Sequence, residues 1–307
     1  MEQMNPGIIS QFLADIKLRG LSHWTEDRHR FNINLYAKWC VEHGSDPTKG
    51  REEDILAYLA HLREKGLRQS SLRQEFSSLS SFFEFLEERG QIQKNPIPRI
   101  KKRYLRSYKD EIQSRQIISI EDASRMVNAT IDSRDKAILL VLFKTGIRRS
   151  ELISLDVSDA SLEDMTLTLK PTPKRSNRLV FFDEECSRAL SRWLKARENR
   201  YKIDGEMALF TDYKGRRLKA TGLDNLVNLA AMRIGIHDPK SKKMEDHFSP
   251  HSARHWNTTY LLRAGMKREY VQWLRGDAIK EAVDIYFHVD PKDVREAYLA
   301  CIPQLGI

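Results

Sequence analysis

TGIRRSELISL, residues Thr145–Leu155, joins two predicted helices in the second half of the chain. Gly146 ends the first helix, because glycine readily adopts the left-handed conformation found at helix C-termini. The next helix opens one or two residues after Arg148, so Arg148 falls at the junction and is able to point away from the packed surface. The same residues also fit an ordinary amphipathic turn in which Arg148 pairs with Glu151. The segment alone therefore predicts a helix junction and no function.

The surrounding region, residues 117–307, combines helices with short strands. Apolar spacing predicts helices at 120–128, 134–145, 184–201, 221–234, 250–264, 267–274, 279–287 and 291–301. Strand-like stretches lie at 167–170, 178–182 and 208–210, and the turn-rich PTPKRSN separates the first two. We therefore expect a mostly helical α+β domain with a small β component.

Residues 1–90 are predicted to form a small helical bundle. Helical spacing of apolar residues appears at 8–18, 31–40, 55–62 and 72–86. This region carries 12 basic and 14 acidic side chains, so the bundle as a whole does not attract a polyanion. Any contact that it makes with DNA has to come from a one-sided basic patch.

Residues 91–116 differ in composition from both neighbours. They contain two prolines, no sustained periodicity, and eight basic against two acidic side chains, which is typical of a linker between domains. Basic side chains in such a strap are able to lie along phosphates. The candidate DNA contacts are Lys94, Lys101, Lys102, Arg103 and Arg106. A solvated hinge that binds nothing is the alternative interpretation.

The composition of all 307 residues excludes several classes of protein. With 40% hydrophobic and 31% charged residues the chain is globular, and a net charge of +9 suits a polyanionic partner. The longest apolar run has seven residues, far short of the about 20 that cross a bilayer, so we expect no membrane association. Three widely separated cysteines favour neither disulfides nor zinc and indicate a reducing, cytoplasmic location.

Two further motifs carry residues suited to phosphate chemistry. In SPHSARH, residues 249–255, Ser249 and Pro250 have the composition of a helix start, and His251 and Arg254 share one helical face. An imidazole beside a guanidinium offers several donors to a phosphate. In WLRGDAIKEAVDIYFH, residues 273–288, Asp277 precedes Tyr286 by nine residues. Taken singly, the His251–Arg254 spacing is weak evidence for a site, and Tyr286 is better explained as a packed core aromatic beside Val283 and Phe287.

In their order along the chain, TGxRxSE, HxxRH and RGD followed by Tyr-x-His resemble the tyrosine recombinase (phage integrase) family. The resemblance covers residues 117–307, and the bundle of residues 1–90 with the linker of residues 91–116 looks like the SAM-like core-binding domain of that family. The ending, from EAVDIYFHVDP to IPQLGI, looks more like that of archaeal integrases. The resemblance therefore implies a DNA-clamp domain, a basic linker and a catalytic domain.

The resemblance assigns roles to individual residues of this chain. It implies that Arg148 and Arg254 hold the scissile phosphate, with His251 beside them, and that Tyr286 is the nucleophile. The hairpin lysine of the family falls in LTLKPTPKRSNRLVFF, where we favour Lys174 as general acid. Lys170 is the rival, because the length of this hairpin does not fix the alignment.

Two acidic residues lie near these positions. Glu151 matches the acidic residue that follows the first arginine of the family, and we expect it to support the site. Asp277 departs from the family, which usually has His or Trp at this place. An ionised carboxylate only accepts hydrogen bonds and repels an anion, so Asp277 either takes a proton or orients an arginine such as Arg275 or Arg148.

The expected reaction follows from these residue types. Two guanidiniums stabilise the charge that builds on a phosphorus under attack. A tyrosine with its ordinary pKa of about 10 is ionised in only about one molecule in a thousand at pH 7, so His251 or Asp277 has to accept its proton. A lysine then protonates the leaving 5′ oxygen. The 3′-phosphotyrosyl intermediate stores the bond energy, and no cofactor, metal ion or ATP is implied.

We therefore expect a site-specific DNA recombinase or integrase that acts on double-stranded DNA. The resemblance implies a homo-tetramer on paired sites, monomeric or weakly associated without DNA and nucleoid-associated in the cell, with the last helix, 291–301, docking on a neighbour. Two alternatives remain open at this point. One is a type IB-like topoisomerase, and the other is an architectural DNA-binding protein that keeps the fold without the activity.

Overall fold

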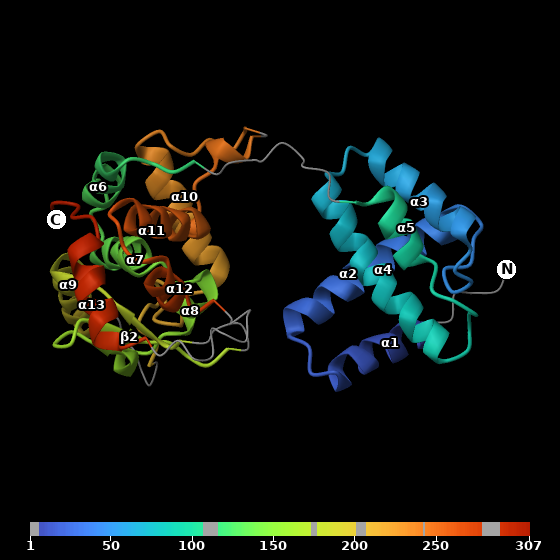
Figure 1. The fold of residues 1–307 in the computed structure, drawn as a ribbon, viewed down its shortest axis with the longest axis horizontal. Helices are drawn as coiled ribbons and strands as arrows, with labels where there is room; N and C mark the ends of the chain where they lie inside the picture. The colour runs from blue at the N-terminus through green and yellow to red at the C-terminus, as the bar shows by residue number, and fades with distance from the viewer. Residues whose placement is uncertain (1–5, 107–115, 173–176, 201–206, 242, 278–288) are drawn as a thin grey trace. The chain divides into compact units, whose positions relative to one another are not determined.

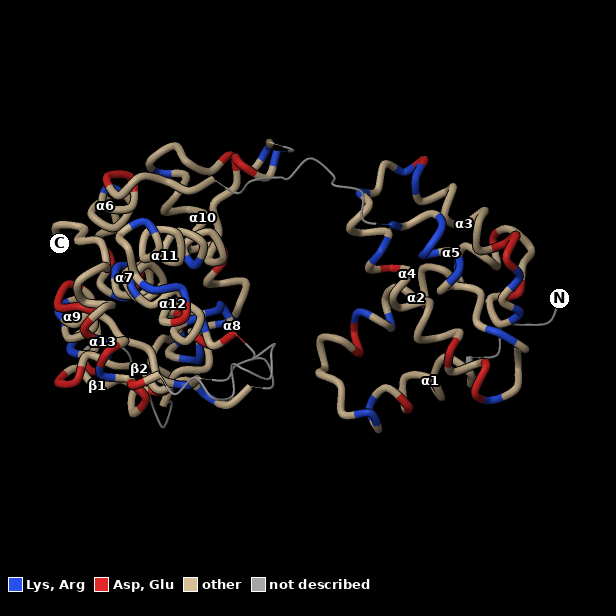
Figure 2. Tube along the Cα trace, viewed as in Figure 1, with Lys and Arg blue, Asp and Glu red and all other residues tan. Residues whose placement is uncertain are grey.

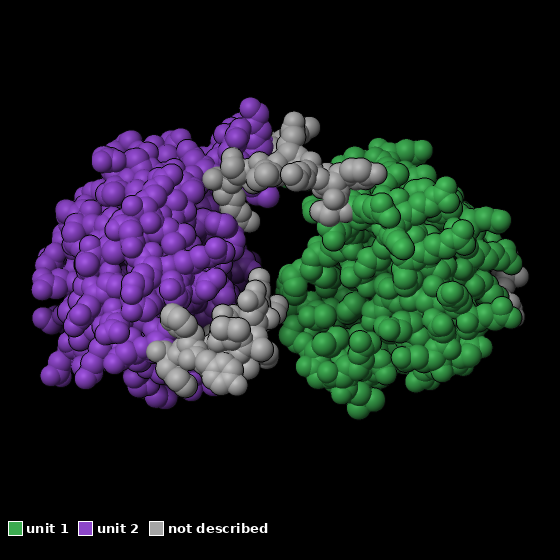
Figure 3. Space-filling view, viewed as in Figure 1, with its two compact units in different colours: residues 1–112 green, residues 113–307 purple. Residues whose placement is uncertain are grey.

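The computed structural model divides the chain into two compact units, residues 1–112 and residues 113–307 (Figures 1 and 3). It describes residues 6–106, 116–172, 177–200, 207–241, 243–277 and 289–307. Each unit has its own hydrophobic core. The predicted fold class, a helical bundle followed by a mostly helical α+β domain, is confirmed.

The described part of unit 1, residues 6–106, is a bundle of five helices. They are α1 (Pro6–Leu18), α2 (His23–Glu42), α3 (Glu52–Glu64), α4 (Gln69–Glu88) and α5 (Ile97–Tyr104). The first turn of α2 is closed by Ser22, which accepts a hydrogen bond from the backbone N–H of Thr25. The apolar faces meet in an aromatic core that includes Tyr36, Tyr58 and Phe83, all at most 1% exposed. The four helices expected in residues 1–90 thus form one bundle.

Helix α5 lies inside the segment that the sequence indicates as a linker. Ile97 and Ile100 are fully buried and belong to the core of unit 1. The side chain of Asn95 accepts a hydrogen bond from the N–H of Ile97 at 3.0 Å and so closes the first turn. Pro98 is compatible with a helix here because it stands in the first turn, where no backbone donor is needed. The linker boundaries at residues 90 and 116 remain a prediction from the sequence.

Unit 2 is built around α7 (Ser133–Thr145), which is buried from Ala137 to Thr145 and packs on α9 and α11 (Figure 1). The other helices are α6 (Ile120–Asn128), α8 (Arg149–Ser154), α9 (Glu184–Arg200), α10 (Ala220–Arg233), α11 (Pro250–Arg263), α12 (Arg268–Arg275) and α13 (Pro291–Cys301), with 3-10 turns at Val157–Asp159 and Met244–Asp246. The longest apolar run of the sequence is therefore the centre of a globular core. Among the described helices, none is long and apolar enough to span a bilayer.

The small sheet has three antiparallel strands in the order β1 (Ala160–Ser161), β2 (Thr166–Thr168) and β3 (Leu179–Phe181). The predicted strand at 208–210 is wrong, because Ala208 forms only an isolated bridge with Asp156. Side chains take the carbonyl oxygens that a longer ladder would use. Trp193 donates to the carbonyl of Leu209, and Arg197 donates to that of Ala208.

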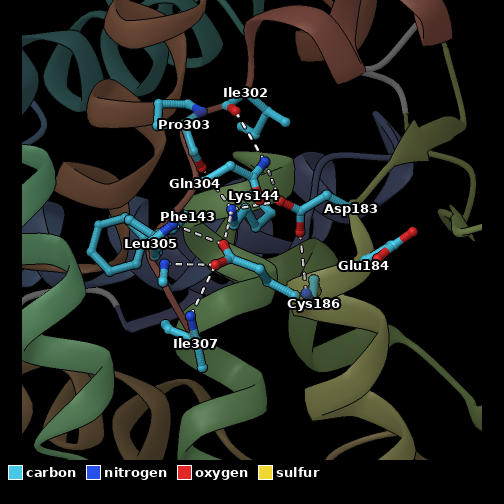
Figure 4. A network of polar contacts seen from close by, with 12 residues as sticks. Phe143, Lys144, Asp183, Glu184, Cys186, Ile302, Pro303, Gln304, Leu305 and Ile307 are labelled. Atoms are coloured by element: carbon cyan, nitrogen blue, oxygen red, sulfur yellow. Dashed lines mark hydrogen bonds and ion pairs between the residues drawn. The ribbon is translucent and has the colours of Figure 1, made fainter.

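The C-terminal segment after α13 is fixed to unit 2 by a buried ion cluster (Figure 4). The Nζ of Lys144, a residue with no exposed surface, donates to Asp183 and Glu185 at 2.6 Å each. It also donates to the carbonyl oxygen of Pro303 at 2.6 Å. Glu185 in turn accepts the backbone N–H groups of residues 305–307 at 2.6–3.0 Å. We call Lys144, Asp183 and Glu185 the lysine cluster.

Candidate active site

Arg148 is the N-cap residue of α8, three residues after the last residue of α7. Gly146 terminates α7 with φ +59°, the left-handed conformation expected from the sequence. The backbone N–H of Arg148 donates to Glu151 at 2.6 Å, and its guanidinium donates to the same carboxylate at 3.0 Å. Glu151 is buried, whereas the side chain of Arg148 is 31% exposed. Pairing with Glu151 therefore orients Arg148 and leaves part of its side chain open to solvent.

Arg254 approaches the same place from α11. Ser249 and Ser252 form a capping box at the start of this helix, in which the N–H of Ser249 donates to the hydroxyl of Ser252 at 3.1 Å. Pro250 is the first residue of the helix, where its missing N–H costs no hydrogen bond. The guanidinium of Arg254 is 5% exposed and donates to the carbonyl of Gly146 at 2.7 Å. A second donation, at 3.0 Å, reaches the carbonyl of Arg275. Arg254 is thus fixed by backbone oxygens from two other segments.

His251 lies on the first turn of α11, three residues before Arg254, and is exposed. Its Nε2 lies 3.1 Å from the Nε2 of His255, and the two rings meet edge to face with centroids 4.6 Å apart. A hydrogen bond between two ring nitrogens requires one to donate and the other to accept. The pair therefore holds the imidazole of His251 at the surface beside the buried arginine.

Asp277 follows α12 directly and faces both arginines. One carboxylate oxygen lies 3.6 Å from Nη2 of Arg148 and 3.7 Å from Nη2 of Arg254. The other accepts a hydrogen bond from Nε of Arg275 at 2.7 Å. We call Arg148, Arg254, Arg275 and Asp277 the arginine cluster. With three guanidiniums against the carboxylates of Asp277 and Glu151, this cluster has a positive formal charge and suits an anion.

Two family models match the chain and together cover most of it. The description "Phage integrase, N-terminal SAM-like domain" matches residues 8–93, and "Phage integrase family" matches residues 110–293. The chain belongs to the phage integrase family. The prediction of a tyrosine recombinase, made from the three motifs, is therefore confirmed.

Curated relatives of this integrase-family chain are named tyrosine recombinases. It is 29% identical over 92% of its length to tyrosine recombinase XerC of Herpetosiphon aurantiacus, of which 90% is covered. It is 28% identical to tyrosine recombinase XerA of Pyrococcus horikoshii, with 96% of this chain and 94% of the relative covered. The predicted enzyme class, a site-specific recombinase, is thereby supported, and neither the topoisomerase nor the non-catalytic alternative is favoured.

A solved structure shows that the fold is shared with other integrases. The Tn1549 transposon integrase, in complex with a circular intermediate DNA, superposes with a TM-score of 0.70 at 19% identity, covering 95% of this chain and 98% of that one. At this identity the likeness establishes the architecture alone. The motif residues of the chain therefore have to be placed from its own geometry.

The geometry brings together some of the predicted site residues of this integrase and leaves others unplaced. Arg148, Arg254 and Asp277 meet in the arginine cluster, with His251 on the adjoining helical turn. Tyr286 and Lys174 lie outside the described residues. The predicted roles of all six residues therefore remain proposals.

Lys170, the rival general acid, is described and is held by two aspartates. Its Nζ lies 2.8 Å from carboxylate oxygens of both Asp156 and Asp159. Hydrogen bonds to Asp156 and Asp159 raise the pKa of Lys170 above its ordinary value. A lysine whose proton is held more tightly is a weaker acid. These contacts argue against Lys170 as the proton donor.

Sequence reasoning missed two residues that support the arginine cluster. Thr258 donates to the carbonyl of Arg254 at 2.9 Å and accepts from Arg275 at 3.3 Å. Asn257 donates to two carbonyls at the end of α7. Their spacing was the available signal, since residues three and four positions beyond Arg254 lie on its side of the helix.

The predicted DNA-contact residues 94 and 101–106 belong to unit 1, on and around α5 (Figure 2). Lys94, Lys102, Arg103 and Arg106 are exposed, and Lys101 is half-buried with its Nζ 3.4 Å from the hydroxyl of Ser77. Nε of Arg106 donates to the carbonyl of Lys102 at 2.8 Å, and the side chain of Gln69 donates to the carbonyl of Arg106 at 3.1 Å. These side chains form a basic surface on the solvent side of α5.

Proposed function

We propose that this integrase-family chain binds double-stranded DNA, cleaves one strand with Tyr286, and rejoins the end to a different strand at a specific site. The observation that carries the proposal is the arginine cluster, in which Arg148 and Arg254 both come within 3.7 Å of one carboxylate oxygen. A phosphate oxygen has the charge and the acceptor geometry that such paired guanidiniums bind. The partner is therefore a phosphodiester.

The two arginines are suited to different parts of one task. Arg254, buried and fixed by backbone carbonyls, provides a rigid donor that needs no reorganisation during the reaction. Arg148, partly exposed, is accessible to the incoming strand. As the phenolic oxygen of Tyr286 attacks phosphorus, charge builds on the non-bridging oxygens and both guanidiniums stabilise it.

Proton transfers accompany the exchange of bonds at phosphorus. The new bond joins the phenolic oxygen of Tyr286 to the 3′ phosphate, and the bond to the 5′ oxygen breaks. His251, exposed beside the cluster, accepts the proton of the phenol. Lys174 donates a proton to the leaving 5′ oxygen, an assignment supported by the two aspartates that hold Lys170.

Asp277 serves the arginines in this proposal. Its hydrogen bond to Arg275 at 2.7 Å and its proximity to Arg148 and Arg254 support an orienting role. A carboxylate in this place repels a phosphate instead of donating to it, so the third hydrogen-bond donor of the site has to come from elsewhere. His251, on the first turn of α11, is our candidate for that donor.

Unit 1 binds the duplex through the basic surface around α5. Lys94, Lys101, Lys102, Arg103 and Arg106 neutralise backbone phosphates without reading sequence. Strand exchange requires two paired sites, and four copies of the chain supply one nucleophile for each strand. Such a homo-tetramer assembles on DNA in the nucleoid. Within one chain, α13 packs on α11 and α12 through Val294 and Tyr298, and its opposite face, with Leu299 40% exposed, is available to a neighbour.

Substitution of the nucleophile tests the proposal. With a nicked suicide duplex, the wild-type chain is expected to form a covalent protein–DNA adduct, and Tyr286→Phe is expected to form none while binding the duplex normally. Tyr213→Phe is a matched control, because Tyr213 is 70% exposed and lies outside the arginine cluster. The adduct is measured on a denaturing gel. An adduct that persists in Tyr286→Phe refutes the assignment of the nucleophile.

A further inference from the structure

Asn257 connects the helix of Arg254 to the end of α7. It lies three residues after Arg254 on α11 and is 5% exposed. Its amide nitrogen donates to the carbonyl of Phe143 at 2.8 Å and to that of Lys144 at 2.9 Å. One side chain thus satisfies two of the carbonyls that every α-helix leaves without an intrahelical partner at its C-terminus.

Gly146 and Asn257 are matched in shape. A Cβ placed on Gly146 would lie 2.6 Å from the amide oxygen of Asn257, closer than non-bonded atoms approach. Gly146 also has φ +59°, which disfavours any other residue. The absence of a side chain at position 146 is therefore what lets the amide reach the end of α7.

The contact bears directly on the geometry of the arginine cluster. On the face of α11 that carries Asn257, Arg254 donates to the carbonyl of Gly146 at 2.7 Å. Two residues beyond Gly146 the chain reaches Arg148, which opens α8. Arg254 and Asn257, both on α11, therefore bind the backbone carbonyls of residues 143, 144 and 146. These carbonyls lie just before Arg148 in the chain.

We propose that Asn257 is a positioning residue that sets the spacing between Arg148 and Arg254. The inference rests on the proposed strand-cleavage reaction, in which both arginines hold one phosphate. Without the amide, the carbonyl of Phe143 loses its side-chain partner and the turn after α7 gains freedom. A misplacement of about 1 Å in a positioned catalytic group is enough to slow a reaction about 100-fold.

The test compares Asn257→Ala with Thr130→Val in the full-length chain. Thr130 is a suitable control because it is 2% exposed and its hydroxyl donates to the carbonyl of Met126 at 2.9 Å, away from the arginine cluster. Both substitutions remove buried hydrogen bonds to helix carbonyls. Three quantities are measured: hydrogen exchange of the backbone amides of residues 146–152, the adduct rate on saturating nicked duplex, and the DNA dissociation constant.

We expect Asn257→Ala to raise exchange over residues 146–152 at least tenfold and to lower the adduct rate about 100-fold, with DNA affinity within threefold of the wild type. Thr130→Val should change none of the three quantities. Asn257→Ser, which keeps one donor, should give an intermediate rate, and it replaces the alanine variant if that variant does not fold.

Three results overturn the inference: exchange that rises evenly over unit 2, exchange that matches Thr130→Val, or an adduct rate that stays within threefold of the wild type. Failure of the proposed function has a different signature, since the wild-type chain would then form no adduct on any duplex. In that case the exchange measurement alone still decides whether Asn257 holds the turn before Arg148.

Discussion

Lys144, near the end of α7, and Arg148, at the start of α8, lie four residues apart, and their surroundings differ in exposure and in contact length. Lys144 has no exposed surface, and its three oxygen partners all lie at 2.6 Å. Arg148 is 31% exposed, and its distance to Asp277 is 3.6 Å, longer than a hydrogen bond. The lysine cluster is thus closed around its own chain, whereas the arginine cluster is shaped to accept one more anion.

This difference separates stability from function at neighbouring positions. Buried charges have to be paired within the protein, because no water compensates for a lost partner. Partly exposed charges contribute little to folding, yet they are available to a ligand. Substitutions in the lysine cluster are therefore expected to act on unfolding, and substitution of the partly exposed Arg148 on catalysis.

The largest effect is expected for Lys144→Met. The substitution fills a similar volume but leaves the carboxylates of Asp183 and Glu185 without their cation. Breaking a buried ion cluster in this way costs about 3–5 kcal/mol. Urea unfolding of the full chain should show this loss in free energy, whereas Lys214→Met, at an exposed position, should change it by less than about 0.5 kcal/mol. A loss below about 1 kcal/mol for Lys144→Met would contradict a closed cluster.

Next in size is the effect of Arg148→Lys on the rate of adduct formation. Lysine keeps the charge but loses the planar fork that binds two oxygens at once. We expect the rate on a nicked duplex to fall about 100- to 1,000-fold, and the free energy of unfolding to change by less than about 1 kcal/mol. The adjacent Arg149, which pairs with Asp224 at the surface, provides the control: Arg149→Lys should leave the rate within threefold.

A rate within tenfold of the wild type for Arg148→Lys would mean that the arginine cluster does not hold the reacting phosphate. A large loss of stability would mean that Arg148 belongs with the structural residues, like Lys144. Either result would remove the distinction between the two clusters.

The helices were predictable from the sequence because their signals are local. Ser249 and Pro250 begin α11, Asp290 caps α13 by accepting from the N–H of Lys292, and the predicted ends at 128 and 301 agree with the structure. The arginine cluster was predictable in part, since the order of motifs brought Arg148 and Arg254 into one site. Packing then added supports such as Asn257, whose role appears only when α7 and α11 meet.

The lysine cluster could not be predicted, because its partners are distant in sequence. Lys144 and Pro303 are 159 positions apart, and no periodicity connects them. A lysine at the end of an apolar helix is ordinarily read as a surface residue. The strand expected at 208–210 failed for a related reason, because two side chains from α9 occupy the carbonyls of Ala208 and Leu209. Local sequence patterns predict helices and strands, but they do not predict hydrogen bonds between residues that are distant in the sequence.

A smaller, pH-dependent effect is expected for Glu185→Gln. Burial opposes ionisation of Glu185, but the ammonium of Lys144 and the backbone N–H groups of Leu305 and Ile307 outweigh it, so the pKa of Glu185 lies below its ordinary 4.5. A carboxylate with a lowered pKa stabilises the folded state above its unfolded pKa and loses that contribution as the pH falls through the folded pKa. The wild type should therefore exceed Glu185→Gln in stability by about 1–3 kcal/mol at pH 7.

That difference should shrink as the pH falls below 4.5, the ordinary value for this carboxyl. Urea unfolding at pH 7 and at successively lower pH measures it. Glu184→Gln serves as the control, because the neighbouring Glu184 side chain is 80% exposed and should contribute little at either pH. A difference that stays constant as the pH is lowered would show that Glu185 does not act through its charge.

The smallest effect is expected for Arg188→Ala, which tests where the C-terminal segment is held. Arg188 donates to the carbonyl of Ile307 at 2.8 Å, but its side chain is 52% exposed. Water replaces an exposed contact of this kind at little cost, so the loss should stay below about 1 kcal/mol. Glu185 binds the same segment from the interior through three backbone N–H groups. If Arg188→Ala lowered the free energy of unfolding in urea as much as Glu185→Gln, the C-terminal segment would be held mainly from the surface. The lysine cluster would then not be the main structural anchor of this segment, and the contrast with the arginine cluster would fail.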